Sequence, residues 1–301
     1  MSPAQVTRLA ASFFLFLALS LAVACGGEGE DEQAAAGAID DDTPPITGGD
    51  DDAAGDDDIA GDDDIAGDDD IAGGDDDYCT SAPSDEQGIF VSFTGSDQNE
   101  GTRQSPKRSI TAALSAAGGS RDAVYVAQGS YAEFVQTSFS LCGGYESANW
   151  TRNINNHVTI IEAPGGQALE VSASVKAGEL IVEGFTVHAG ASPVETYAVT
   201  VQSGSVVLAH NIINAENPAG SSGLIVGAAA TAHAESNTII GDAHGVLLNG
   251  GEAVLRDNTI SSRQGQLNTY GVYVNGTATL TDNRITAGTA PQSYGVYVVE
   301  G

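Results

Sequence analysis

The stretch Glu252-Ala-Val-Leu-Arg-Asp-Asn-Thr-Ile260 decides the fold of this chain, because its pattern is written five times. Each copy is nine residues long, and its seventh position is Phe185 in the first copy and Asn in the other four. Successive seventh positions are 21 to 26 residues apart. Self-similarity at such a period indicates a solenoid. The five copies are residues 179–187, 205–213, 231–239, 252–260 and 277–285.

Two short runs in each repeat alternate between apolar and other residues. Val272 and Val274 belong to the first run of one repeat, and Ala278 and Leu280 belong to the second. Alternation with period two predicts strands that bury one face. The motif then ends in Asn-x-Ile, where the Ile begins a third short strand. Two or three strands per repeat with no helical pattern between them predict an all-β fold, a parallel β-helix.

The repeated asparagines are predicted to have a structural role. A sharp corner between two strands favours a left-handed backbone conformation, which Asn tolerates better than most residues. Stacked side-chain amides can also bond to one another and to the corner backbone. Phe185 interrupts the series, so the ladder is expected to start one coil later, or the first corner to be built differently. The predicted ladder is Asn211, Asn237, Asn258 and Asn283.

Residues 1–24 read as a secretory signal peptide. Arg8 supplies a positive charge, and an uncharged apolar run follows that is too short to span a membrane. The run ends in Leu21-Ala-Val-Ala-Cys25, which resembles a bacterial lipobox, so Cys25 is the predicted lipidation site. Ordinary cleavage beside a chance Cys is the alternative. The resemblance implies an outer-membrane lipoprotein, periplasmic or surface-exposed, because Gly26 and not Asp follows the Cys.

Residues 25–78 are predicted to be a disordered tether. They contain 22 acidic residues, no Lys or Arg, and tandem Gly-Asp-Asp-Asp-Ile-Ala units. Such a composition cannot bury enough apolar surface to fold, and its like charges repel. The Asp triplets lack the residue order of a calcium loop, so any Ca²⁺ binding there would be loose, and no cofactor is expected. The acidity also argues against a nucleic-acid partner.

Two cysteines remain after Cys25. An even pair in an exported domain predicts one disulfide, Cys79 to Cys142, with two free thiols as the alternative.

The chain from 79 to 155 is predicted to be an N-terminal cap with the first strands. In it, residues 88–93 and 123–127 read as strands. Residues 109–117 read as a short helix with Ser109 as N-cap. The coils are expected to occupy residues 156–301 and to be incomplete at the C-terminus.

A family resemblance covers residues 88–155. It is carried by Gly95-Ser-Asp97, Ser109-Ile110, Val124-Tyr-Val-Ala127, Gly129-Ser-Tyr131 and Leu141-Cys-Gly-Gly-Tyr145. These motifs resemble the N-terminal part of bacterial pectin-lyase-like proteins. Within that group, they are most similar to a domain of unknown function in surface lipoproteins of deltaproteobacteria. The resemblance implies a right-handed parallel β-helix in which the short helix covers one open end of the solenoid.

No catalytic residue is assigned from the sequence. After residue 78, no two of the remaining aspartates are adjacent, and Asp257 and Asp282 occupy the same repeat position, which favours a corner role over a lyase site. Of the polygalacturonase motifs, only Ala243-His244-Gly245 is present as a fragment. Three further histidines fall at different repeat positions and are expected to face solvent, so no metal site is predicted. They are His188, His210 and His233.

One outward stripe is left without a structural explanation. Along the first strand, the outward positions change from Thr200 to aliphatic and then aromatic residues. Exposed apolar stripes indicate a partner surface, and tyrosine suits sugar rings. Long loops at 261–269 and 287–293 that fold over the stripe are the alternative. The candidate ligand face is Ile225, Leu247, Tyr273 and Tyr297.

The leading interpretation is therefore a non-catalytic, lipid-anchored envelope protein that binds polysaccharide or another cell-surface partner. A polysaccharide lyase or glycoside hydrolase of the same fold is the first alternative. A structural spacer or adhesin module is the second.

Overall fold

The structure is a computed structural model that describes residues 78–173, 178–217 and 220–299. The described residues belong to one compact unit, Asp70–Gly301. The predicted signal peptide, Cys25 and nearly all of the predicted tether lie outside the described residues. No helix among the described residues is long and apolar enough to cross a membrane.

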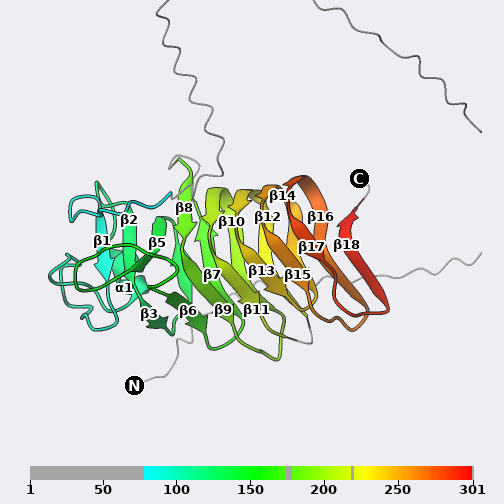
Figure 1. Ribbon diagram of the computed structural model, residues 1–301, viewed down its shortest axis with the longest axis horizontal. Coiled ribbons are helices and arrows are strands. Elements are labelled where there is room, and N and C mark those ends of the chain that lie inside the picture. Colours follow the sequence, from blue (N-terminus) through cyan, green and yellow to red (C-terminus); the bar gives the residue numbers. More distant parts are fainter. Residues whose placement is uncertain (1–77, 174–177, 218–219, 300–301) are drawn as a thin grey trace, which may run out of the picture. The chain divides into compact units, whose positions relative to one another are not determined.

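The described unit consists of parallel strands wound into successive coils (Figure 1), which confirms the predicted all-β solenoid. One helix, α1 (Ile110–Ala116), accompanies the strands. The strands are β1 (Gly88–Val91), β2 (Ala123–Ala127), β3 (Gly129–Tyr131), β4 (Val135–Thr137), β5 (Ser140–Tyr145), β6 (Thr159–Ala163), β7 (Gln167–Ser172), β8 (Leu180–Glu183), β9 (Phe185–Ala189), β10 (Thr196–Ala209), β11 (Ile212–Ala215), β12 (Ser221–Glu235), β13 (Thr238–Gly241), β14 (His244–Arg256), β15 (Thr259–Ser262), β16 (Asn268–Thr281), β17 (Arg284–Thr286) and β18 (Gln292–Val298).

The coils form two parallel sheets. The larger sheet has 11 strands, in the order β1-β2-β5-β8-β10-β12-β14-β16-β18 with β4 and β7 beside this path. The smaller has 7 strands, in the order β17-β15-β13-β11-β9-β6-β3. The two alternating runs of each repeat join into one long strand, 13 to 15 residues in β10, β12, β14 and β16. Their pairing is irregular at mid-strand, for example between Val201 and Ser203, where the two runs meet.

The core lies between the two sheets and consists of aligned aliphatic side chains. Leu224, Val246 and Val272 occupy one register and are fully buried. The Ile residues that end the motif form a second row from the smaller sheet. A Cβ atom added to Gly271 would come within 2.4 Å of Ile285 Cγ2. This close approach explains why Gly recurs just before the buried valines.

The asparagines form a hydrogen-bonded row inside the corner. Asn237 Nδ2 donates to Leu208 O at 2.7 Å and to Asn258 Oδ1 at 3.0 Å, while Asn237 Oδ1 accepts from the backbone N–H of Asn211 at 2.9 Å. The same bonds recur along the row, with separations of 26, 21 and 25 residues. Asn237 is 2 % exposed, so its buried polar groups are satisfied by the neighbouring coils.

The structure corrects the expected backbone of this corner. The left-handed residue is the one before each Asn, namely His210, Ser236, Asp257 and Asp282, with φ between 51° and 54°. The Asn side chain must point inward to bond to both neighbouring coils, whereas the side chain before it turns outward. The sixth residue of the nine-residue motif therefore takes the positive φ. Gly184, with φ 79°, holds this position before Phe185. The Phe185 N–H donates to Asn211 Oδ1 at 3.0 Å, so the first coil joins the ladder through its backbone.

The helix α1 covers the N-terminal end of the core, as predicted. Ser109 is its N-cap and accepts from Ala112 N at 3.2 Å. The Glu133 carboxylate accepts from the backbone N–H groups of Ile110 and Thr111, at 2.8 and 2.9 Å. Ile110 and Ala113 are buried in the main core. The cap therefore excludes water from an end where strands would otherwise expose apolar side chains.

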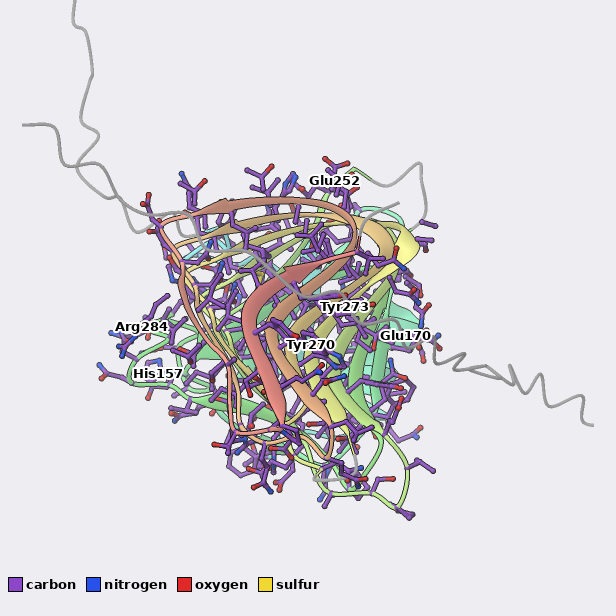
Figure 2. All side chains as sticks on the ribbon, turned by 90° about the vertical axis from the view of Figure 1, so that its right-hand side faces the viewer. His157, Glu170, Glu252, Tyr270, Tyr273 and Arg284 are labelled. Carbon is purple, nitrogen blue, oxygen red and sulfur yellow. A yellow bond between two sulfur atoms is a disulfide. The ribbon has the colours of Figure 1, made fainter. Side chains whose placement is uncertain are left out.

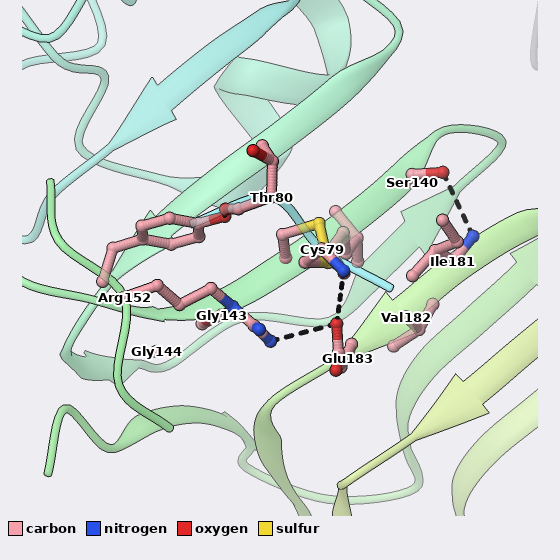
Figure 3. Close-up of a disulfide and its surroundings, with 12 residues drawn as sticks. Cys79, Thr80, Ser140, Gly143, Gly144, Arg152, Ile181, Val182 and Glu183 are labelled. Atoms are coloured by element: carbon pink, nitrogen blue, oxygen red, sulfur yellow. Dashed lines mark hydrogen bonds and ion pairs between the residues drawn. A yellow bond between two sulfur atoms is a disulfide. The ribbon is translucent and has the colours of Figure 1, made fainter. Parts of the chain in front are cut away.

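A disulfide joins Cys79 to Cys142, as predicted, with both residues buried. Beside it lies an ion pair that the sequence did not suggest (Figure 3). Arg152 Nη2 is 3.1 Å from Glu183 Oε2, and the Cys79 N–H donates to the same oxygen at 2.7 Å. The Tyr145 hydroxyl donates to Thr80 O at 2.6 Å. These contacts fix the segment at residues 79–80 to the outside of β5 and β8.

Candidate ligand-binding face

The candidate residues lie in one register on the outer side of the larger sheet. Tyr273 pairs with Leu247 on β14 and with Tyr297 on β18, and it lies between the buried residues Val272 and Val274. We call this series the first row. It consists of Gln136, Glu170, Thr200, Ile225, Leu247, Tyr273 and Tyr297.

A second row runs beside the first and was missed in the sequence. Tyr270 pairs with His244 and with Tyr294, although it is three residues from Tyr273 and strict alternation would turn it inward. Gly271 lies at the turn between them, and its lack of a side chain lets the chain pass close to Ile285. The second row is Gln167, Tyr197, Ser222, His244, Tyr270 and Tyr294. Together the rows make the two-row face.

Five rings form a continuous cluster at one end of this face. Tyr270 stacks on His244 at a centroid distance of 5.4 Å and on Tyr294 at 5.6 Å. Tyr273 stacks on Tyr297 at 5.5 Å, and Tyr270 meets Tyr273 edge-on at 5.1 Å. These separations lie in the range in which aromatic pairs attract. We call His244, Tyr270, Tyr273, Tyr294 and Tyr297 the aromatic cluster.

The stacking changes how the tyrosines meet a ligand. Their rings lie nearly parallel along the solenoid axis, with interplanar angles of 11° between Tyr270 and Tyr294 and 22° between Tyr273 and Tyr297. Neighbouring rings therefore cover part of each other's faces. A ligand that lies along the face would meet ring edges and phenol groups more than open ring faces.

The cluster is partly open to solvent. Tyr270 and Tyr273, which have a paired strand on each side, are half-buried, and Tyr294 and Tyr297, on the last described strand, are 37 % and 38 % exposed. Figure 2 shows Tyr270, Tyr273 and Glu170 on one side of the coils, Arg284 and His157 on the opposite side, and Glu252 on a third.

The loops at 261–269 and 287–293 are held by contacts away from the cluster. Arg263, in the first loop, contacts Asp242 through Nε at 3.1 Å and Glu216 through Nη1 at 3.3 Å. The two loops also bond to each other, because Thr289 N donates to Arg263 O at 2.9 Å. The loops therefore stack on each other at this corner, and the neighbouring Tyr270 and Tyr273 keep half-buried side chains.

Polar groups occupy the other end of the two-row face. Glu170 accepts from Gln136 Nε2 at 2.7 Å and from Gln167 Nε2 at 3.3 Å. Nearer the aromatic cluster, Tyr197 donates to Glu195 at 2.5 Å, and Ser222 Oγ lies 3.2 Å from His244 Nδ1. Thr200, between these groups, is only 5 % exposed. The face therefore changes from hydrogen-bonding side chains to aromatic ones along its length.

Burial shifts the pKa of three groups on this face. It lowers the pKa of His244, although the nearby Glu195 carboxylate opposes the shift. It raises the pKa of Tyr197, and the hydrogen bond to Glu195 adds to that effect. Burial and the neighbouring phenols also raise the pKa of Tyr270. At neutral pH these three side chains are therefore uncharged, and the face is a neutral aromatic surface beside carboxylates.

The three histidines expected to face solvent lie at different places of the coil. His188, on β9, lies 3.8 Å from Glu162 and 3.8 Å from Glu216. His210 is a left-handed corner residue, and His233, on β12, contacts Glu179 at 2.7 Å. Among the described residues, no group of three or more His, Cys, Asp or Glu side chains is arranged to hold a metal ion.

Two surface hollows lie away from the two-row face. One of about 320 Å³ follows the corner beside the smaller sheet and is lined by Thr186, His210, Ile212 and Ser236, among others. Another of about 450 Å³ adjoins the N-terminus of α1, where Asp97 and Glu133 already accept hydrogen bonds from the helix and its cap. Neither brings together a nucleophile and a base.

The coils, the internal Asn row and the capping helix define a parallel β-helix protein. Residues 93–299 match the family described as "Protein of unknown function (DUF1565)", and the chain belongs to this family. The match covers the cap and the coils, including both rows of the face. Comparison with curated proteins and with solved structures finds no match.

Proposed function

We propose that this chain is a lipid-anchored envelope protein whose two-row face binds polysaccharide without catalysis. The observation that carries the proposal is the aromatic cluster, which is outward, partly exposed and continuous with hydrogen-bonding side chains. Exposed apolar patches with polar rims are typical of interaction sites. Tyrosine combines a large apolar ring with a hydroxyl that can bond to sugar hydroxyls.

The mode of contact follows from the ring stacks. A glycan chain lying across the coils would place its C–H groups against ring edges and its hydroxyls near the phenols of Tyr273 and Tyr297. Glu170 and its glutamine partners would supply further acceptors and donors. Carbohydrate hydroxyls need such paired groups, because an unpaired polar group at an interface costs affinity.

A glycan array with the full chain tests this proposal. Wild-type protein is expected to bind some glycans, and the double variant Tyr273→Ala/Tyr297→Ala to lose that signal. Phe93→Ala is the matched control, since Phe93 is 52 % exposed and lies beside the N-terminus of α1, where no residue of either row lines the surface. Equal binding by wild type and the double variant would contradict the role of the face. Release of reducing ends or unsaturated products from any bound glycan would contradict the non-catalytic part.

The envelope location is supported by the sequence of the first 78 residues. The apolar run, the lipobox-like Leu21-Ala-Val-Ala-Cys25 and the acidic stretch together suit export, lipidation and a spacer between membrane and β-helix. Metabolic labelling with a fatty acid, followed by membrane fractionation, tests it. Cys25→Ala is expected to abolish label and membrane retention, and an unlabelled wild-type protein would contradict the anchor.

A further inference from the structure

We propose that the two-row face selects uncharged polysaccharides, built from neutral hexopyranose units, over polyuronates. This inference rests on the glycan-binding function proposed above and concerns the charge of the ligand. It follows from where the structure places carboxylates, neutral donors and cations around the aromatic cluster.

Glu170 brings a negative charge to the polar end of the face. Its carboxylate accepts hydrogen bonds from Gln136, Gln167 and Ser172, at 2.7, 3.3 and 3.4 Å. All three donors are neutral, so among the described residues no cation bonds to this carboxylate. A carboxylate held in this way is a good acceptor for sugar hydroxyls and a repulsive neighbour for a uronate.

Glu195 brings a second negative charge beside the aromatic cluster. Tyr197 donates to it at 2.5 Å, and its field reaches His244. His244 does not compensate, because burial keeps its pKa below the ordinary value and leaves the ring neutral at neutral pH. The aromatic end of the face therefore also has an acidic border.

The cations of the described residues lie elsewhere. Within residues 78–173, 178–217 and 220–299, neither row contains Lys or Arg. Arg263 is held by Asp242 and Glu216, and Arg284 lies on the opposite side of the coils (Figure 2). The remaining ones are Arg103, Lys107, Arg108, Arg121 and Arg152 in the N-terminal part, and Arg256, which pairs with Glu235.

These charges decide between ligand classes. A polyuronate carries one negative charge per sugar unit, so it would place several charges near Glu170 and Glu195, where the described residues provide no counter-charge. Residues 79–301 add a general repulsion, since they contain 9 basic and 19 acidic residues. A neutral chain meets the same hydroxyl acceptors, amide donors and ring edges at no electrostatic cost.

The test compares binding of the full chain to neutral glucans, mannans and xylans with binding to polygalacturonate and alginate, by affinity electrophoresis at low salt. Glu170→Gln/Glu195→Gln removes two charges from the face. Glu162→Gln/Glu252→Gln removes two charges elsewhere and controls for the net charge of −31. Wild type is expected to bind a neutral polysaccharide at least about tenfold more tightly than either polyuronate. The face variant should strengthen polyuronate binding about fivefold, and the control less than about twofold.

Three outcomes separate the claims. Polyuronate binding as tight as neutral binding, with loss of both in Tyr273→Ala/Tyr297→Ala, would overturn the selectivity and leave the glycan-binding face intact. Equal effects of the two charge variants would also overturn it, because global charge would then explain the preference. Failure to bind any polysaccharide would overturn the proposed function itself.

Discussion

Arg152 and Glu183 form an ion pair that water does not reach. Their side chains are 3 % and 0 % exposed, and Nη2 and Oε2 are 3.1 Å apart. Burial raises the pKa of Glu183, while Arg152 and the Cys79 N–H partly oppose that shift. The pair lies next to the disulfide and joins the non-repetitive cap to β8, so it ties the start of the described chain to the first coils.

Removing one partner of this pair should be strongly destabilising. Glu183→Gln leaves the Arg152 charge buried without its counter-ion, and we expect a loss of about 3–5 kcal/mol in the free energy of unfolding. Arg152→Met/Glu183→Leu removes both charges and should recover most of that loss. Urea unfolding of the two variants and the wild type measures both effects. A cost of less than about 1 kcal/mol for Glu183→Gln would show that the pair is accessible to water.

Replacing an Asn of the internal row should destabilise the protein more than replacing an exposed Asn. Asn237→Ala leaves Leu208 O and the backbone N–H of Asn211 without partners in a buried corner. Since each of these two unsatisfied buried groups costs about 1–3 kcal/mol, the variant should lose about 2–6 kcal/mol in the free energy of unfolding. Asn275→Ala is the control, because Asn275 is exposed on the next-but-one coil. Equal denaturation midpoints for the two variants would contradict the structural role of the row.

The left-handed corner residue should tolerate glycine but not a β-branched residue. Asp257 has φ 53° and is exposed, so Asp257→Val should cost about 1–2 kcal/mol through backbone strain alone. Asp257→Gly should cost little, because Gly adopts positive φ freely. Thr259→Val, two residues later on β15, provides a control at an exposed strand position. Asp257→Val should have the lowest melting temperature of the three variants. An unchanged melting temperature for Asp257→Val would show that residue 257 does not have the left-handed conformation.

Much of this architecture could be predicted from the sequence, because a solenoid repeats its constraints. The period, the buried valine and isoleucine rows and the identity of the Asn row all follow from aligned copies. The left-handed position was predicted one residue too late, since propensity favours Asn there and the competing demand, an inward amide, appears only in three dimensions. The Arg152–Glu183 pair lies outside the repeats, so no alignment of copies could reveal it.

The candidate face was predictable only in part. The first row follows from strict alternation in Tyr270-Gly-Val-Tyr-Val274. The second row does not, because the turn at Gly271 breaks the alternation and brings Tyr270 to the same side as Tyr273. Glu170 was missed because β7 lies before the first copy of the motif, although its register with Thr200 continues the same row.

His244 should make stability depend on pH. Its folded pKa is lowered by burial, while in the unfolded chain it returns to about 6.5. Below pH 6.5 the unfolded state therefore binds a proton that the folded state does not. The free energy of unfolding consequently decreases as pH falls from 6.5 toward the folded pKa of His244. The groups around the ring are Ser222, Glu195, Tyr270 and Tyr273.

The comparison variant is His244→Phe, which keeps an aromatic ring on Tyr270 and cannot be protonated. The melting temperature of wild type should fall more steeply than that of His244→Phe between pH 7 and pH 5. Parallel curves would show that His244 is accessible to water and titrates normally in the folded state.

The aromatic cluster is proposed to bind a glycan. The most direct test of this proposal is isothermal titration of the full chain with an oligosaccharide of neutral hexopyranose units chosen from the array. We compare wild type, Phe93→Ala and Tyr273→Ala/Tyr297→Ala, each shown to be folded by circular dichroism. We expect equal affinity for the first two and at least about a tenfold loss for the double variant, about 1.4 kcal/mol. Unchanged affinity in the double variant would contradict the proposal.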